Sequence, residues 1–501
     1  MLPGVVTDMY LMDPITIILF IVTCVFLAIV LYGQKQNVHK NYPPGPPTLP
    51  IIGHMHIISM EKPYVTFHEL AEKYGSVFSL QLGTQKMVVL HGYETVKDAL
   101  LNHAEEFSGR PHVPVFQDIA KEHGIIFSNG NNWKVMKRFA LSTLRDLGMG
   151  KKTIEDKILE ECKNLVKIFK TYKGEPFENT TIVNAAVANI IVSILLGHRF
   201  EYDDPKLQRL LTIINDSIKI MGSPMVLLYN AFPSLLRLLP GSHRKVVPYV
   251  NELHAFIRET FTNQKNQLDV NDLRNVVEVF LVRQKEEKPN PELYFSDANL
   301  TSLITDLFAA GMDTTSSTLR WGLLLMMKYP EIQKNVQTEI EKVIGSGEPQ
   351  VMHRKQMPYT DAVIHEIQRF GNIVPTNIPH ATTQDVTFKG FFIPKDTQVI
   401  PLLYSVLRDK EHFEKPEEFY PQHFLDSEGN FVKNEAFIPF SAGKRSCAGE
   451  ILAKMELFLF FTTLLQNFTF QATPGAKLDL TGSVGFTTHP LKHEICAITR
   501  N

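Results

Sequence analysis

An uncharged segment near the N-terminus constrains this chain more than any other stretch of its sequence. The residues from Pro14 to Tyr32, PITIILFIVTCVFLAIVLY, include no charged side chain, and about 20 mostly apolar residues allow a helix to cross a bilayer core. Acidic residues precede the segment, whereas Lys35 and Lys40 follow it. Because positively charged flanks stay on the cytoplasmic side, residues 1–33 are predicted to form a single-pass anchor that leaves the rest of the chain in the cytosol.

A cleaved signal peptide is the alternative to an anchor. Its apolar core would be shorter, a cationic region would precede it and a small-residue cleavage site would follow it. The residues after the segment, Tyr32-Gly33-Gln34-Lys35, fit such a site poorly, so we favour the uncleaved anchor. The Asn-x-Ser/Thr sequons would then face the cytosol and stay unglycosylated, and a glycan on any of them would reverse the topology. These sequons lie at Asn179, Asn215, Asn299 and Asn467.

A proline-rich hinge at residues 34–50 separates the anchor from the remainder. In Tyr42 to Pro50, YPPGPPTLP, closely spaced prolines fix φ and remove N–H donors, so that neither a helix nor a central strand forms. No second linker, repeat or low-complexity tract follows, so residues 51–501 are expected to form one large domain. Its patterning is mainly α with a small β portion, including strand pairs around Val77–Gly92 and Val386–Leu403.

Composition excludes several classes of function. A net charge of −2 and a pI near 6.8 give no basic excess for binding a phosphate backbone, so nucleic acid is not expected as a partner. The cysteines are far apart and form no Cys-x-x-Cys pair, so neither a disulfide framework nor a structural zinc site is indicated. They are Cys24, Cys162, Cys447 and Cys496.

The longest helical pattern, SDANLTSLITDLFAAGMDTTSSTLRWGLLLMM, carries an apolar stripe that changes character along the chain. The stripe begins with Leu300, Leu303, Ile304, Leu307 and Phe308 at helical spacing. The same face continues through Gly311, Thr314, Thr315 and Thr318, with Asp313 alongside. Such residues are poor helix formers. They indicate either a functional site or a glycine that lets another helix approach, with threonines bonding back to the preceding turn.

Cys447 stands in FIPFSAGKRSCAGE, between a glycine-bearing loop and an apolar helical run. The free N–H groups at a helix N-terminus stabilise a thiolate. A single thiolate beside Arg445 suits a haem, with sulfur on the iron and the cation on a propionate, while Gly443 allows a tight turn. A buried structural cysteine is the alternative on this segment alone.

Taken together, the motifs resemble those of the haem-thiolate monooxygenases of the cytochrome P-450 superfamily. FSAGKRSCAG, Phe440 to Gly449, matches the signature Phe-x-x-Gly-x-Arg-x-Cys-x-Gly at every fixed position. AGMDTT, Ala310 to Thr315, is similar to the oxygen-activating helix, and EIQR, Glu366 to Arg369, to the Glu-x-x-Arg pair. With FSGR, Phe107 to Arg110, the likeness extends over nearly the whole chain and is greatest to the microsomal branch called family two. It implies a cytochrome P-450 fold in residues 51–501.

The resemblance assigns roles to individual residues. Cys447 is expected to be the axial iron ligand, Asp313 and Thr314 to relay protons, and Glu366 and Arg369 to form a structural pair. The residues expected to contact haem b are Arg110, Trp133, Lys137, His380, Phe440 and Arg445. The apolar residues expected to meet a lipophilic substrate are Val113, Phe116, Phe127, Phe232, Phe308, Ala309, Ala310, Val374, Ile378 and Phe486.

Two positions depart from the family pattern. In WKVMK, Lys137 replaces the usual arginine, and a lysine offers a point charge instead of a forked contact. In PQHF, His423 replaces a permanent cation. The pairing within both networks is therefore open.

The resemblance implies a reaction in which RH, O2, two electrons and two protons give ROH and water. No Gly-x-Gly-x-x-Gly motif opens a helix after a strand, so electrons from NADPH are expected to arrive through a membrane-bound flavoprotein reductase, with cytochrome b5 as a further partner. The expected location is the endoplasmic reticulum membrane, in contact with lipid. The candidate docking cations are Lys134, Arg138, Arg145, Lys151, Lys152 and Lys444.

Substrate identity stays open among fatty acids, steroids, eicosanoids and foreign compounds. Two other classes of function compete with the monooxygenase. Haem-thiolate isomerases or dehydratases rearrange peroxides without a reductase and often lose the acid and threonine that Asp313 and Thr314 retain here. A non-catalytic haem sensor or membrane-anchored binder would need no proton relay.

Overall fold

A computed structural model describes residues 16, 18–25, 41–287, 294–483 and 485–500. The predicted anchor lies mostly outside the described residues; its described part, residues 16 and 18–25, is helical and exposed. Among the described helices, none alone has the length and apolar composition to span a bilayer. Two helices that meet at a 60° bend, Pro205–Met221 and Pro224–Ala231, satisfy those two criteria as a pair.

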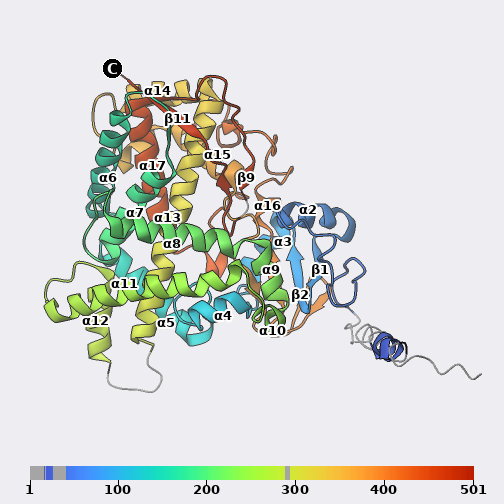
Figure 1. Ribbon diagram of the computed structural model, residues 1–501. Helices are drawn as coiled ribbons and strands as arrows, with labels where there is room; N and C mark the ends of the chain where they lie inside the picture. Colours follow the sequence, from blue (N-terminus) through green and yellow to red (C-terminus); the bar gives the residue numbers. More distant parts are fainter. Residues whose placement is uncertain (1–15, 17, 26–40, 288–293, 484, 501) are drawn as a thin grey trace, which may run out of the picture.

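Helices dominate the described part of the chain (Figure 1). Many begin with proline in the first turn, where its missing N–H costs nothing. The α-helices are α2 Pro63–Tyr74, α3 Tyr93–Lys97, α4 Pro114–Ala120, α5 Gly130–Asp146, α6 Lys152–Thr171, α7 Thr180–Leu195, α8 Pro205–Met221, α9 Pro224–Ala231, α10 Pro233–Leu236, α11 Val246–Gln267, α12 Val276–Glu286, α13 Asp297–Lys328, α14 Pro330–Val343, α15 Pro358–Gly371, α16 Leu403–Val406 and α17 Glu450–Asn467. Short tighter or wider helical turns are η1 Asp98–Asn102, η2 Ser242–Lys245, η3 Val351–Gln356, η4 Pro421–Phe424 and η5 Gly443–Arg445.

The strands form small sheets beside the helices. The largest has the order β1-β2-β7-β4, and the others are β3-β11-β8, β10-β9 and β5-β6. The strands are β1 Val77–Leu82, β2 Gln85–Leu90, β3 Phe177–Glu178, β4 His380–Ala381, β5 Val386–Phe388, β6 Phe391–Ile393, β7 Gln398–Pro401, β8 Phe468–Gln471, β9 Gly482–Ser483, β10 His489–Pro490 and β11 Glu494–Thr499. The early strand pair is confirmed as an antiparallel hairpin. The later segment contains the β5–β6 hairpin, whereas β7 pairs with β2 and β4.

The long helix α13 runs through the middle of the helical body, packed against α7, α11, α15 and α17 (Figure 1). Ser296 caps its N-terminus by accepting a hydrogen bond from the Asn299 N–H at 3.2 Å. At Gly311 a Cβ atom would lie 2.8 Å from Cδ1 of Ile191 on α7. The glycine therefore allows the two helices to approach closely, as the structural alternative predicted, and the same residue also lines the main cavity.

A fully buried ion pair fastens α15 to the segment that leads toward Cys447. Arg369 donates from Nε and Nη2 to the two carboxylate oxygens of Glu366, both at 2.7 Å. Glu366 also accepts from the Tyr420 N–H at 2.7 Å and lies 3.1 Å from Nδ1 of His423. The other guanidinium protons go to the backbone carbonyls of Leu407, Pro416 and Glu418. His423 therefore joins the pair directly, where the family pattern has a permanent cation.

Breaking this pair is expected to destabilise the fold strongly, since the buried Glu366 carboxylate would lose its permanent cation and keep only the Tyr420 N–H and His423. We predict that Arg369→Met lowers the free energy of unfolding by about 3–5 kcal/mol, measured by chemical denaturation. The matched control is Arg209→Met, which breaks a two-pronged pair with Glu252 whose side chains are 51% and 45% exposed instead of 0%. That loss should stay below about 1 kcal/mol, and equal losses in the two variants would contradict the prediction.

Candidate functional site

One large cavity lies between α13 and the loop that carries Cys447. It encloses about 1680 Å³ of empty space, including its openings to solvent. Helices α5, α7, α13 and α17 contribute walls, together with the segment between α15 and β4. Of the residues predicted from sequence, those that line it are Arg110, Trp133, Lys137, Ala310, Thr314, Val374, Ile378, Phe440, Arg445 and Cys447.

Cys447 lies just before the first turn of α17 and is exposed to this cavity. Burial raises the pKa of its thiol, whereas hydrogen bonds from the backbone N–H groups of Gly449 and Glu450 lower the pKa. Those donors belong to the start of the helix, where they have no partner within the helix. The helix N-terminus thus offsets part of the effect of burial on the thiol, and a metal ion that displaced the proton would supply the remaining stabilisation of the thiolate.

The turn before Cys447 requires glycine at position 443. Gly443 has φ +71°, and a Cβ atom there would lie 1.9 Å from the backbone oxygen of Leu100. The loop therefore passes directly against the backbone of η1. Farther along, the Cys447 N–H donates to the Phe440 carbonyl at 3.0 Å, which closes the loop around the thiol.

Two arginines at this cavity are held by backbone carbonyls instead of acids. Arg110 donates to the carbonyls of Ile126 at 2.9 Å, Ile378 at 3.0 Å and Pro379 at 2.8 Å. Arg445 donates to Ser108 and Ser128, both at 2.8 Å, and to Ile125 at 3.3 Å. Its guanidinium also lies 3.7 Å from the centre of the Trp133 ring. Because all these oxygen acceptors are neutral, both charges remain uncompensated.

The positive charges affect one another. Burial lowers the pKa of Arg110 to about 9, and burial together with Arg110 lowers the pKa of Arg445 to about 8. Burial and both arginines lower the pKa of Lys137, whose Nζ donates to the Lys444 carbonyl. Among the described residues, no carboxylate forms an ion pair with these three cations. An anionic ligand would restore their charge balance, so the donor set fits a haem whose propionates meet the cations and whose iron meets Cys447.

Helix α13 presents a hydroxyl-bearing stripe to the cavity. Leu307, Ala310, Gly311, Thr314 and Thr315 line it, in agreement with the predicted face. The Thr314 hydroxyl donates to the Ala310 carbonyl at 2.7 Å, the back-bonding expected of a threonine within a helix. Its oxygen remains free to accept from a ligand or water.

Asp313, predicted as the partner of Thr314, does not line the cavity. Its carboxylate accepts from the Thr487 hydroxyl at 2.6 Å and lies 3.7 Å from Nε2 of His489. Successive residues of a helix point in directions about 100° apart. Here the Asp313 carboxylate falls on the side of Thr487 and His489, whereas Thr314 and Thr315 face the cavity. Asp313 is buried against the β9–β10 hairpin instead.

His380 and most of the predicted substrate residues also lie outside the cavity lining. His380 is buried, with Nδ1 2.7 Å from the Phe107 carbonyl. Phe116 stacks on Phe127 with ring centroids 3.5 Å apart and meets Phe486 edge-on at 5.8 Å. Phe308 is buried. The other predicted substrate residues that do not line the cavity are Val113, Phe232 and Ala309.

Sequence reasoning missed two acids that line the cavity. Asp306 on α13 accepts from the Ile125 and Ile126 N–H groups at 2.7 and 3.0 Å, and burial raises the pKa of its carboxyl to about 7. Glu456 on α17 is buried, and burial raises its pKa to about 8. Each is a single acid within an apolar helical run, in SLITDLFAA and ILAKMELFLFF. A single acid within an apolar helical run was therefore the sequence signal that could have identified both residues.

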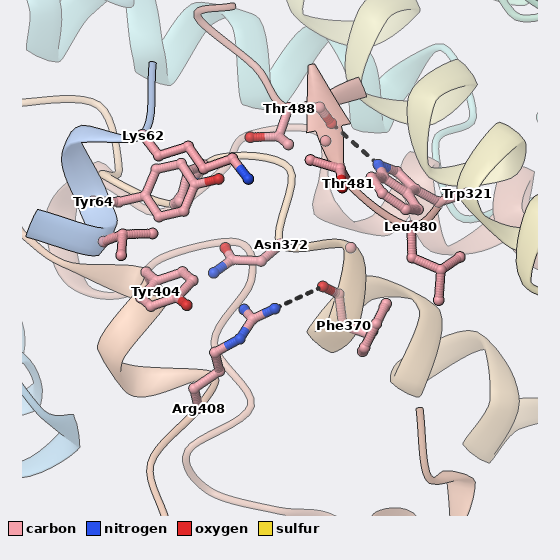
Figure 2. Close-up of a pocket in the computed structure, with 14 residues that line it drawn as sticks. Lys62, Tyr64, Trp321, Phe370, Asn372, Tyr404, Arg408, Leu480, Thr481 and Thr488 are labelled. Atoms are coloured by element: carbon pink, nitrogen blue, oxygen red, sulfur yellow. Dashed lines mark hydrogen bonds between the residues drawn. The ribbon is translucent and has the colours of Figure 1, made fainter. Parts of the chain in front are cut away.

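A second, polar pocket lies apart from this site (Figure 2). Lys62, Tyr64, Tyr404 and Arg408 line it, and the Arg408 guanidinium donates to the Phe370 carbonyl at 3.4 Å. Neither Cys447 nor the residues that face it take part, so this pocket is separate from the thiol chemistry.

The predicted docking cations differ in their partners. Lys152 pairs with Glu155 and Asp156, and Lys444 pairs with Glu105. The other four, Lys134, Arg138, Arg145 and Lys151, are exposed at α5 or just after it. Within the described chain these four form no ion pair, so they keep their charge for a partner.

Comparison with known proteins agrees with this geometry. The family described as Cytochrome P450 matches residues 43–497. Cytochrome P450 2K4 of Oncorhynchus mykiss is 49% identical over 473 residues, 93% of this chain and 94% of the relative. Cytochrome P450 2C29 of Mus musculus is 45% identical over 490 residues, 97% and 100% of the two chains. Cytochrome P450 2E1 of Rattus norvegicus is 45% identical over 490 residues, 97% and 99%.

These relatives all carry the family number two, which confirms the predicted branch. The mainly α fold with a small β portion is confirmed as well. With matches along nearly its whole length, the chain belongs to the cytochrome P450 family of haem-dependent monooxygenases.

Proposed function

We propose that this protein inserts one oxygen atom from O2 into lipophilic organic substrates, using NADPH-derived electrons from a flavoprotein reductase. The observation that carries the proposal is the Cys447 thiol in a cavity whose cations Arg110, Lys137 and Arg445 form no ion pair with an acid in the described part of the chain. The test is a carbon monoxide spectrum of the reduced protein, followed by reductase-dependent turnover of a lipophilic substrate panel. Turnover of organic peroxides alone, without use of NADPH, would favour the isomerase or dehydratase class.

Different residues of the cavity would hold the haem and accept the substrate. Haem b, when bound, supplies the activation of O2 and the oxidation of the substrate. Cys447 would hold the iron, while Arg110, Lys137 and Arg445 would hold the propionates. The apolar lining from Ala310, Val374 and Ile378 would exclude water and accept a lipophilic ligand.

Proton delivery falls to α13. Thr314 has its hydroxyl at the cavity and can hold a water molecule there. Asp313, one residue before it, is buried and accepts a hydrogen bond from outside the cavity. We propose that Asp313 stores a proton for Thr314, and burial, which raises the pKa of its carboxyl, supports that role.

Electrons would arrive at the exposed cations of α5. Lys134, Arg138 and Arg145 lie on the helix that also supplies Trp133 and Lys137 to the cavity. An acidic reductase, or cytochrome b5, bound there would lie close to the site. We further propose that residues 1–33 anchor the protein in the endoplasmic reticulum membrane with the catalytic domain in the cytosol.

Loss of the thiol should abolish the spectroscopic signature of the site. We predict that Cys447→Ala shows no thiolate-type carbon monoxide spectrum, because none of the other described cysteines lines the cavity: Cys162 and Cys496 are buried elsewhere, and Cys24 lies in the N-terminal helix. Cys162→Ala is the matched control and should retain the spectrum. A thiolate-type spectrum in Cys447→Ala would contradict the ligand assignment.

Loss of the Thr314 hydroxyl should uncouple NADPH use from product formation. We predict that Thr314→Ala releases more H2O2 and forms less product per NADPH, by about 10-fold or more, with the carbon monoxide spectrum intact. Reaction driven by added peroxide should suffer less, since it needs fewer delivered protons. The control is Thr314→Ser, and unchanged coupling in Thr314→Ala would remove the proposed role.

Docking through surface charges should make reductase-supported turnover sensitive to salt. At physiological ionic strength charges are screened beyond about 8 Å, so added salt should slow this turnover more than peroxide-supported turnover. Arg138→Gln should weaken the salt dependence, whereas Lys152→Gln, whose charge is already paired, should not. Equal salt sensitivity of the two reactions would argue against the docking face.

A further inference from the structure

A chain of hydrogen bonds runs beside α13 on the side away from the cavity. Asp313 Oδ2 accepts from Thr487 Oγ1 at 2.6 Å, and Thr487 Oγ1 lies 3.0 Å from Nε2 of His489. The other ring nitrogen of His489, Nδ1, lies 2.6 Å from Ser317 Oγ. The Asp313 side chain is 4% exposed and the His489 side chain 21% exposed. The chain therefore leads from a residue in contact with solvent to the buried acid.

The direction of every donor in this chain follows from the chemistry of its groups. An ionised Asp313 only accepts, so Thr487 spends its one hydroxyl proton on it and must accept from His489. A neutral His489 that donates from Nε2 can accept only at Nδ1, so Ser317 donates there. All donors then point toward Asp313.

We infer that His489 and Thr487 form a proton wire that reprotonates Asp313. The Ser317 hydroxyl first turns from donor to acceptor, and a hydronium ion at the exposed edge of His489 then gives a proton to Nδ1 and leaves as water. The Nε2 proton passes to Thr487, and the original Thr487 hydroxyl proton passes to Asp313. One proton enters and one reaches the carboxylate, and His489 ends as the other neutral tautomer. The inference rests on the proposed function, in which Asp313 supplies protons toward Thr314.

Burial of the wire reduces the difference in pKa that opposes such a transfer. An ordinary imidazole is more basic than a carboxylate by about 2.6 pKa units, which would oppose movement of the proton to Asp313. Here burial raises the pKa of Asp313 and lowers the pKa of His489, so the gap narrows. Arg320, also on α13, faces both groups, and Glu178 on β3 and His493 before β11 are the next charged or titratable neighbours.

The β9–β10 hairpin holds the wire in place. The Trp321 indole donates to the Thr488 carbonyl at 3.2 Å (Figure 2), and the Thr488 N–H donates to the Ile373 carbonyl at 2.8 Å. Side chains of extended residues alternate in direction, so Thr487 and His489 face α13 while Thr488 lines the pocket of Figure 2. Thr488 is therefore a matched control residue outside the wire.

The functional test compares four variants of the full-length, haem-containing protein with its reductase. Thr487→Val, which keeps shape but loses the hydroxyl, and His489→Gln, which cannot titrate, should each lower product formed per NADPH, by about two- to tenfold. This is less than the ~10²-fold effect of a direct acid. Both should also make the product formed per NADPH less dependent on pH. Thr487→Ser should restore the product formed per NADPH, and Thr488→Val should give the same value as the parent protein. Parent-like coupling and pH dependence in Thr487→Val and His489→Gln would overturn the inference.

A titration independent of turnover separates this inference from the proposed function. With ¹³C-labelled histidine, the His489 signal is assigned by its loss in His489→Gln, and its pKa is measured by NMR. Replacing Asp313 with Asn should lower the His489 pKa, because the carboxylate is the group that raises it. An unchanged pKa would show that the two groups do not interact and would overturn the wire. If the pKa of His489 responds to Asp313 but no NADPH-dependent turnover is found, the proposed function fails and the interaction between the two residues stands.

Discussion

Two buried guanidinium groups organise the site. Arg110 and Arg445 together bind backbone carbonyls from residues 108, 125, 126, 128, 378 and 379. Segments that are far apart in the chain therefore converge on the same two side chains. Since the acceptors are neutral, the positive charge is left for a ligand, and an anionic cofactor is the natural group to complete it. The same contacts that build the cavity wall thus prepare it for the haem.

Buried acids on α13 and α17 complement this positive end of the cavity. Asp306 fixes the Ile125–Ile126 backbone, Asp313 faces the β9–β10 hairpin, and Glu456 lies within α17. Burial raises the pKa of each carboxyl. Asp306 and Glu456 line the cavity, and their pKa values of about 7 and 8 let them hold protons near neutral pH, which suits a reaction that consumes protons.

The aromatic cluster of Phe116, Phe127 and Phe486 lies beyond the cavity lining. Its members come from α4, the loop after it and the loop between β9 and β10. The role of these three residues in substrate binding therefore stays a prediction.

Much of the fold and the core of the site could be predicted from local sequence. Helical spacing located the face of α13, the glycine and arginine pattern marked the turn at Gly443, and the thiol of Cys447 followed from the helix after it. These features depend on neighbouring residues, which the chain itself specifies. Other features depend on contacts between separate segments. The partner of Asp313 and the acid that pairs with His423 are each more than 50 residues away along the chain, and Phe116 on α4 stacks on Phe127 in the following loop. Only the packed structure decides such contacts, because a polar side chain takes whichever partner burial leaves within reach.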